Sequence, residues 1–357
     1  MSLKTVRLKI NIFKSQKVAK FAGFVLVLHK FLTDTFMKKI QLAVLMAVFS
    51  ATIAFAQDRH FSQFYSSPLT LNPALTGAFD GKYRVGGTYR DQWRGLLEQP
   101  YQTFSFGADL RLSAPFAERG SNDKFGIGLL FFRDIVNTLD FSTTQIALSG
   151  AYHKSLAALD NSQYLSLGFQ AGLTQRNVNY DALTFQDQWN GISGYTLPRA
   201  ERLPENNFGY MDLSVGLNYS VVFAPKTSLF LGAAYHHFNR PNVAFFTGEA
   251  IPKQPLSPRI SAQIAGQFPI NPTNTITMSP RILFSTQGPH LKINAGTTFR
   301  AVVDQTYGTA LHIGGWVRPV KSVDGINFDA IVFTAGLELN NILLGFSYDI
   351  NLPNIQR

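Results

Sequence analysis

Apolar and polar residues alternate in many segments of the chain after residue 82. In segment 103–112 (TFSFGADLRL), apolar residues occupy the even-numbered positions, and Thr, Ser, Gly, Asp and Arg occupy the odd ones. A period of two residues is typical of a β-strand whose two faces meet different surroundings. The pattern predicts about thirteen strands and no amphipathic helix between them. The strands are expected near 83–93, 103–112, 124–134, 141–153, 164–174, 211–220, 228–238, 258–267, 275–286, 291–300, 307–318, 327–338 and 342–350.

The length of these segments favours strands that cross a membrane. Soluble strands most often have about five or six residues, whereas a tilted membrane strand needs about 9–11. The small and hydroxylated residues on the polar side suit a wet lumen. Aromatic residues near the strand ends are typical of interfacial girdles: Tyr89, Trp93, Phe131, Phe132, Tyr235, Phe238, Trp316 and Tyr348.

These features predict an all-β fold, a transmembrane antiparallel β-barrel formed by residues 83–357. A sheet in lipid is expected to close, because an open edge leaves backbone groups unpaired in hydrocarbon. Bacterial single-chain barrels have even strand numbers. We therefore expect about 14 strands, one of them missed in the count or absent after the final NLPNIQR. A soluble sandwich or propeller is the alternative.

Residues 37–56 have the pattern of a secretory signal peptide. Lys38 and Lys39 precede an apolar run that ends in Ala-Phe-Ala, which predicts cleavage between Ala56 and Gln57. Residues 1–36 are then interpreted as an upstream, non-native extension, with an unusually long basic signal region as the alternative. The protein is expected to be exported.

Excluding residues 1–56 changes the charge of the chain. The whole sequence carries a formal net charge of +10, but this segment contains nine Lys and Arg residues and one acidic residue, Asp34. The remainder has 23 basic and 21 acidic residues, so nucleic-acid binding loses its support. With no cysteine, the chain has no disulfide, no thiolate metal site and no lipoprotein anchor.

No catalytic motif stands out in the remaining sequence. The histidines lack a metal-binding spacing, and adjacent His236 and His237 are expected on opposite faces of a strand. Gly126 and Gly128 form a G-x-G, but within a strand pattern, where small residues suit a tightly packed wall. The sequence predicts no catalytic residue, no cofactor and no metal site, and hence not an enzyme.

Residues 57–82 lie between the predicted cleavage site and the first strand. The segment looks too broken for a helix, and Pro68 and Pro73 disfavour a regular strand. Its aromatic rings need burial, in the barrel lumen or on a partner. We therefore predict a short plug or docking arm, with a partly ordered periplasmic tail as the alternative. The candidate plug or partner-docking residues are His60, Phe61, Gln63, Phe64, Tyr65, Asn72 and Pro73.

The longest segment without strand pattern runs from 177 to 207. A loop of this length is uncommon unless it has a function, and extracellular barrel loops are the longer ones. It is expected to be a surface binding loop or, equally, a loop without a partner. The candidate loop and strand-end interaction residues are Trp93, Phe185, Asp187, Trp189, His237, Arg240 and Pro241.

Several blocks of the sequence are similar to one known family. QDRHFSQFYSSPLTLNPALTG, YRDQWRG, YQTFSFGAD, FQDQ, FLGAAYHHFNRPNVAF and LLGFSYDIN follow one another in this order. Together they resemble the PorP/SprF family, outer-membrane proteins of the type IX secretion system in Bacteroidetes. The resemblance covers nearly all of the chain after residue 56. The chain departs from it in residues 1–36 and in ending where family members usually continue into one further strand.

The resemblance implies a barrel of about 14 strands in the style of long-chain fatty-acid transporters, located in the cell outer membrane. It implies a non-catalytic role in secretion or surface attachment of cargo proteins, including adhesins used in gliding motility. The implied partners are the periplasmic ring lipoproteins, a peptidoglycan-associated protein, the cargo and outer-membrane lipid. An alternative function is transport of small solutes, as by a fatty-acid transporter or a porin.

Overall fold

The computed structural model describes residues 61–94, 100–114, 121–136, 141–157, 162–181, 183–200, 203–246, 253–322 and 325–352. The chain divides between Ala56 and Gln57 into two units, and all the described residues belong to the second. Among them, no helix is both long enough and apolar enough to span a membrane.

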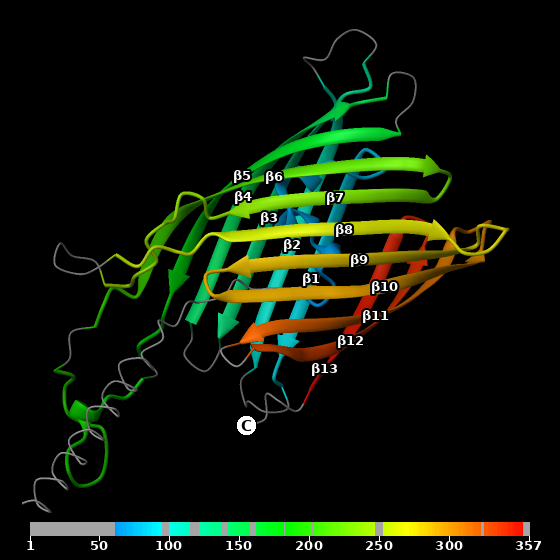
Figure 1. Ribbon diagram of the computed structural model, residues 1–357. Coiled ribbons are helices and arrows are strands. Elements are labelled where there is room, and N and C mark those ends of the chain that lie inside the picture. Colours follow the sequence, from blue (N-terminus) through cyan, green and yellow to red (C-terminus); the bar gives the residue numbers. More distant parts are fainter. Residues whose placement is uncertain are drawn as a thin grey trace, which may run out of the picture. The chain divides into compact units, whose positions relative to one another are not determined.

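Within the described residues, thirteen antiparallel strands form one sheet in which every strand pairs with its neighbours in sequence (Figure 1). Their bounds are β1 Tyr83–Gln92, β2 Tyr101–Ser113, β3 Lys124–Val136, β4 Phe141–Ser155, β5 Gln163–Asn177, β6 Asn207–Ala224, β7 Thr227–His236, β8 Arg259–Pro269, β9 Ile276–Gln287, β10 His290–Asp304, β11 Thr309–Ser322, β12 Gly325–Leu339 and β13 Ile342–Asn351. The predicted all-β antiparallel fold is confirmed.

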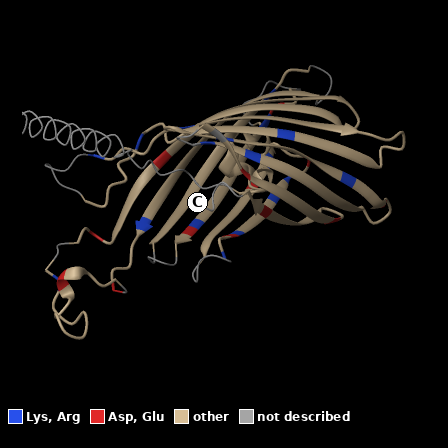
Figure 2. Ribbon diagram, turned by 60° about the horizontal axis from the view of Figure 1, so that its bottom comes forward, with Lys and Arg blue, Asp and Glu red and all other residues tan. Residues whose placement is uncertain are grey.

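The two faces of the sheet are opposite in character to those of a soluble protein. In β2, Thr103, Ser105 and Asp109 are buried, while Phe104 and Leu110 are exposed. The same sidedness recurs from β3 to β6, where leucines such as Leu148 are exposed. Charged residues are sparse along the strands (Figure 2). The buried polar face is called the inner face below.

The two edge strands approach each other through side chains. Because the strand number is odd and every pair is antiparallel, β1 and β13 run in the same direction. Arg90, near the end of β1, forms an ion pair of 3.2 Å with Asp349, near the end of β13. No backbone pairing joins these strands within the described residues. Closure of the barrel and a fourteenth strand therefore stay predictions.

Residues 61–82, called the arm below, lie against the inner face. In Figure 1 the arm (blue) lies between β1–β5 and β7–β10. Contrary to expectation, it contains three short helical turns, η1 Phe64–Ser66, α2 Pro68–Leu71 and η2 Pro73–Leu75. Two of them begin at a proline, whose fixed φ suits the first helical position.

The hydrophobic core lies where the arm meets the sheet. One cluster joins Phe64 and Leu71 of the arm to Leu283, Trp316 and Val332 of the sheet. A second joins Leu69 to Leu130 and Ala147. The assignment of Phe132 and Trp316 to an interfacial girdle was wrong, because both side chains are buried on the inner face.

Candidate functional site

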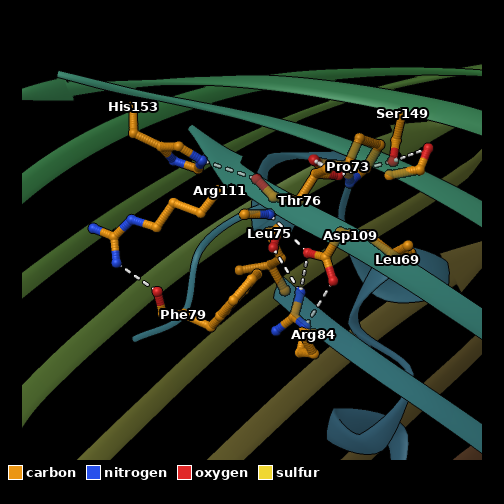
Figure 3. A network of polar contacts seen from close by, with 12 residues as sticks. Leu69, Pro73, Leu75, Thr76, Phe79, Arg84, Asp109, Arg111, Ser149 and His153 are labelled. Atoms are coloured by element: carbon orange, nitrogen blue, oxygen red, sulfur yellow. Dashed lines mark hydrogen bonds and ion pairs between the residues drawn. The ribbon is translucent and has the colours of Figure 1, made fainter. Parts of the chain in front are cut away.

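The arm is joined to the sheet by a polar network around Asp109 of β2 (Figure 3). One carboxylate oxygen of Asp109 accepts hydrogen bonds from the Gly77 amide and from Arg84, both at 2.7 Å. The other accepts from Arg84 Nε at 3.0 Å. Arg84 also donates to the Leu75 carbonyl at 3.0 Å. One bidentate pair therefore holds both the arm and the start of β1.

Thr76 is the centre of a second set of contacts, on β4 and β5. Its hydroxyl donates to the Pro73 carbonyl at 2.8 Å, and its oxygen lies 2.9 Å from Ser149 Oγ. His153 lies between the Thr76 carbonyl, at 2.8 Å, and the Ser166 hydroxyl, at 2.7 Å. All these side chains are buried, so each hydrogen bond satisfies a polar group that burial would otherwise penalise.

Asn72 connects the arm to β6 and β7. Its amide nitrogen donates to the carbonyls of Leu217, at 2.9 Å, and Ala233, at 3.3 Å. Its side-chain oxygen accepts from the Ala74 amide at 2.9 Å and so begins η2. Asn72 is only 1% exposed. The amide thus serves both the local turn and the docking of the arm.

Polar side chains of other strands bind the arm's backbone carbonyls. Gln170 of β5 donates to Leu69, at 3.2 Å, and Arg259 of β8 donates to Thr70, at 3.1 Å. The Leu71 carbonyl lies 3.2 Å from the Ser261 hydroxyl and 3.3 Å from His236 Nε2. These contacts explain why the inner face carries hydrogen-bonding groups where the arm has no strand partner.

Three glycines of the sheet make room for the arm. A Cβ on Gly126 would lie 2.1 Å from the Thr76 carbonyl oxygen, and one on Gly168 would lie 2.3 Å from the Ala74 nitrogen. A Cβ on Gly216 would lie 1.9 Å from the Asn72 side-chain oxygen. These separations are far below contact distance, so the close approach of residues 72–76 requires glycine on β3, β5 and β6.

Aromatic contacts hold the beginning of the arm. The Phe61 ring packs edge-on against Phe132, with centroids 6.2 Å apart. Phe64 and Tyr65 contact Trp316 of β11, with centroids 5.6 and 5.4 Å from the indole. Gln63 reaches β13, where it donates to the Phe346 carbonyl at 2.9 Å. The arm therefore contacts strands from β2 to β13.

This arrangement anchors the arm to the sheet through paired polar groups. Its polar groups hydrogen-bond to one another or to the backbone, and the arm occupies the space that a side chain at the three glycines would need. No group of three His, Cys, Asp or Glu side chains suited to a metal ion occurs among the described residues. Asp212 binds His237 at 2.7 Å, whereas Ser214 lies 3.2 Å from His236, so the acid and the hydroxyl contact different imidazoles.

Sequence comparison assigns the chain to a family. The model of the family described as "Type IX secretion system membrane protein PorP/SprF" matches residues 53–357. The chain belongs to the PorP/SprF family. Comparison with curated proteins gives no significant match.

Among solved structures, the PorP/SprF chain is similar to BamA from Haemophilus ducreyi lacking POTRA domains 1–3. The sequence identity is 10% and the TM-score 0.40, over 76% of this chain. The chain spans 64% of the length of that BamA chain.

The structure places the predicted plug residues of this PorP/SprF chain in two groups. His60, and the predicted cleavage residues Ala56 and Gln57, lie outside the described residues. Phe61, Phe64, Asn72 and Pro73 are buried against the sheet, and Gln63 and Tyr65 are partly buried there. Their proposed role as a plug is not tested by this placement.

The predicted loop residues all belong to one end of the sheet but form separate local contacts. Trp93 packs on Tyr101, with centroids 5.0 Å apart. In the β5–β6 loop, Phe185 precedes the turn η4 Gln186–Gln188, the Asp187 carboxylate accepts from Ala200, and Trp189 packs on Tyr195. In the β7–β8 loop, the Arg240 amide donates to the His237 carbonyl at 2.9 Å, and the Pro241 carbonyl accepts from Leu256 at 2.9 Å.

The expectation for His236 and His237 was wrong. Both side chains are buried, and their partners Ser214 and Asp212 lie on the inner face of β6. Strand β7 ends at His236, and His237 has a φ of 57°, in the left-handed region. Side chains alternate between the two faces only within the strand. Because β7 ends at His236, the left-handed backbone at His237 turns its side chain to the inner face, the face of His236.

Several residues that build the site were not among the candidates: Arg84, Asp109, His153, Gly168, Gly216 and Trp316. The sequence did contain a signal for the inward position of Trp316, because Trp316 alternates in step with the polar residues His312 and Arg318 of β11. Gly168 and Gly216 also lie on the polar side of their strands, but which glycines the arm approaches depends on which strands it crosses.

Proposed function

We propose that this PorP/SprF chain is a non-catalytic outer-membrane component of the type IX secretion machinery. The sheet forms the wall of a β-barrel, and the arm fills part of its lumen. One observation carries the proposal beyond the family assignment: the strands turn polar residues inward and large apolar residues outward. Leu148, in the middle of β4, is 64% exposed, and Leu167, in β5, is 56% exposed. Such a surface suits hydrocarbon.

Loop lengths support one orientation. The turns β6–β7, β8–β9, β10–β11 and β12–β13 at one end of the sheet are short, whereas the β5–β6 and β7–β8 connections at the other end exceed 20 residues. Outer-membrane barrels place short turns in the periplasm and long loops outside. The arm joins β1 at the short-turn end and so enters from the periplasm.

The occupied inner face favours a docking role over a conduit. The arm crosses from β2 to β13 and is held by an ion pair, buried hydrogen bonds and ring contacts. Partners therefore bind at the two ends: ring lipoproteins and a peptidoglycan-associated protein at the periplasmic end, and secreted cargo or adhesins at the long loops. In this reading the barrel supports secretion, cargo attachment or gliding motility.

A deletion strain tests the proposal. Loss of the gene is expected to reduce secretion or surface retention of type IX cargo, and complementation with the full chain is expected to restore it. Spreading on agar is scored in parallel. Unchanged secretion, cargo retention and spreading in a strain without a paralogue would overturn the proposal. Affinity purification from outer membranes should recover the periplasmic ring components.

Transport of small solutes is the second candidate, and a cavity of about 170 Å³ between the arm and β7–β9 favours it. Single-channel recording of the purified chain in planar bilayers separates the two functions. A docking protein gives little steady conductance, whereas a porin gives stable open levels.

A further inference from the structure

A cavity lies between part of the arm and strands β7–β9. It has a volume of about 170 Å³. Its apolar surface comes from Tyr65, Leu71, Leu75 and Phe230, among others, and its cations are Arg84 and Arg281. A dry apolar cavity of roughly 150 Å³ holds a molecule the size of benzene. The space is therefore large enough for one ring or a short aliphatic chain.

The charges around this cavity do not balance. None of the described residues that line it carries a carboxylate. Arg84 is neutralised by Asp109, whose two oxygens it binds at 3.0 and 2.7 Å. Arg281 stacks over the Tyr65 ring, 4.4 Å from its centroid. Within the described residues, no acidic side chain forms an ion pair with Arg281.

We propose that this cavity binds a small organic carboxylate with an apolar body, its carboxylate on Arg281 and its body against the rings of the arm. Guanidinium groups match carboxylates in planar geometry, and the apolar lining distinguishes such a ligand from a bare inorganic anion. Tyr65 lines the cavity and also packs against the sheet, because its ring contacts both Arg281 and Trp316. The site is separate from the loops proposed above to bind cargo.

Calorimetry on the full chain in detergent tests this site, with benzoate as the probe. Benzyl alcohol supplies the same ring without the charge, and inorganic phosphate supplies charge without the ring. Benzoate is expected to bind saturably with one site per chain. Benzyl alcohol should bind at least about tenfold more weakly because it loses the charged hydrogen bond, and phosphate at least about tenfold more weakly because it buries no ring. Benzoate binding without saturation, or phosphate binding as tightly as benzoate, would overturn the proposal.

Three variants locate the binding. Arg281→Gln is expected to weaken benzoate at least about tenfold, whereas Lys253→Gln, which removes an exposed loop charge, is expected to leave it unchanged. Ala265→Leu fills the cavity but keeps Arg281, and it should also abolish binding. This variant decides the question even if Arg281→Gln fails to fold. Equal affinity in Ala265→Leu and the unchanged chain would place the ligand elsewhere.

Discussion

The backbone amide of Gly77 donates to the carboxylate of Asp109 at 2.7 Å, which joins the end of the arm to the second strand of the sheet. Gly77 has a φ of 76°, so the chain turns sharply at this contact. The same carboxylate binds Arg84, seven residues further along, and thereby fixes the path from the arm into β1. The arm and the first hairpin are thus one unit.

Replacing Asp109 should loosen that unit. Asp109→Ala leaves Arg84 and the Gly77 amide without their acceptor, and the free energy of unfolding should fall by about 2 kcal/mol, less than for a fully buried pair because Arg84 is partly exposed. Amide hydrogen exchange over residues 68–82 should accelerate. Asp304→Ala, at the end of β10, is the control and should leave exchange in the arm unchanged. Unaltered exchange in Asp109→Ala would show that the network is dispensable.

The glycines under the arm should tolerate no side chain. Gly168→Ala places a methyl group 2.3 Å from the Ala74 nitrogen, and the backbone must shift. We expect a cost of about 1–3 kcal/mol, typical of overpacking, together with faster exchange in residues 72–77. Gly315→Ala in β11 is the matched control, because a Cβ there meets no atom within 4 Å. Similar losses in both variants would indicate a general effect of glycine on strands.

A charge on the outward face distinguishes a membrane wall from a soluble sheet. Leu148 lies in the middle of β4, so Leu148→Arg should lower the free energy of unfolding of the chain in lipid vesicles by about 2–4 kcal/mol. Leu156→Arg lies just beyond the end of β4 and should cost about 0–1 kcal/mol. Urea titration in vesicles measures both. A soluble protein would tolerate arginine at both exposed positions, so equal stabilities would contradict the membrane reading.

A disulfide can test whether the arm must move. The hydroxyl oxygens of Thr76 and Ser149 lie 2.9 Å apart, and the chain has no cysteine of its own. Thr76→Cys combined with Ser149→Cys should cross-link on oxidation and protect both thiols from maleimide. For a fixed docking arm, cargo secretion should be unchanged. Loss of secretion that a reductant reverses would instead show that the arm is released, and Thr76→Cys alone is the control.

The β5–β6 loop should matter for cargo and not for the periplasmic partners. Trp189 and Tyr195 pair across this loop, and Ile192 between them is 88% exposed. Combining Trp189→Ala with Ile192→Ser should reduce cargo retention at the cell surface severalfold while ring components still copurify. Tyr307→Ser, an exposed ring in the β10–β11 turn at the opposite end, should leave cargo retention unchanged. The reverse pattern would invert the proposed orientation.

The sequence by itself determined the strands and their sidedness. All thirteen expected strands occur, and the period of two assigns residues such as Asp109 and Leu110 to opposite faces. This succeeds because alternation follows from the local geometry of an extended chain. It failed at His237, where the strand had ended and a left-handed φ reversed the side chain.

Only the tertiary structure decided what the inner face holds. Nothing local relates Asn72 to Gly216, or Tyr65 to Trp316, because each pair is separated by well over a hundred residues and meets only through the register and curvature of the whole sheet. Short helical turns in the arm likewise depend on partners in distant strands for their hydrogen bonds. Local alternation fixes the two faces of each strand, whereas the arm's place on the inner face is set by contacts between distant segments.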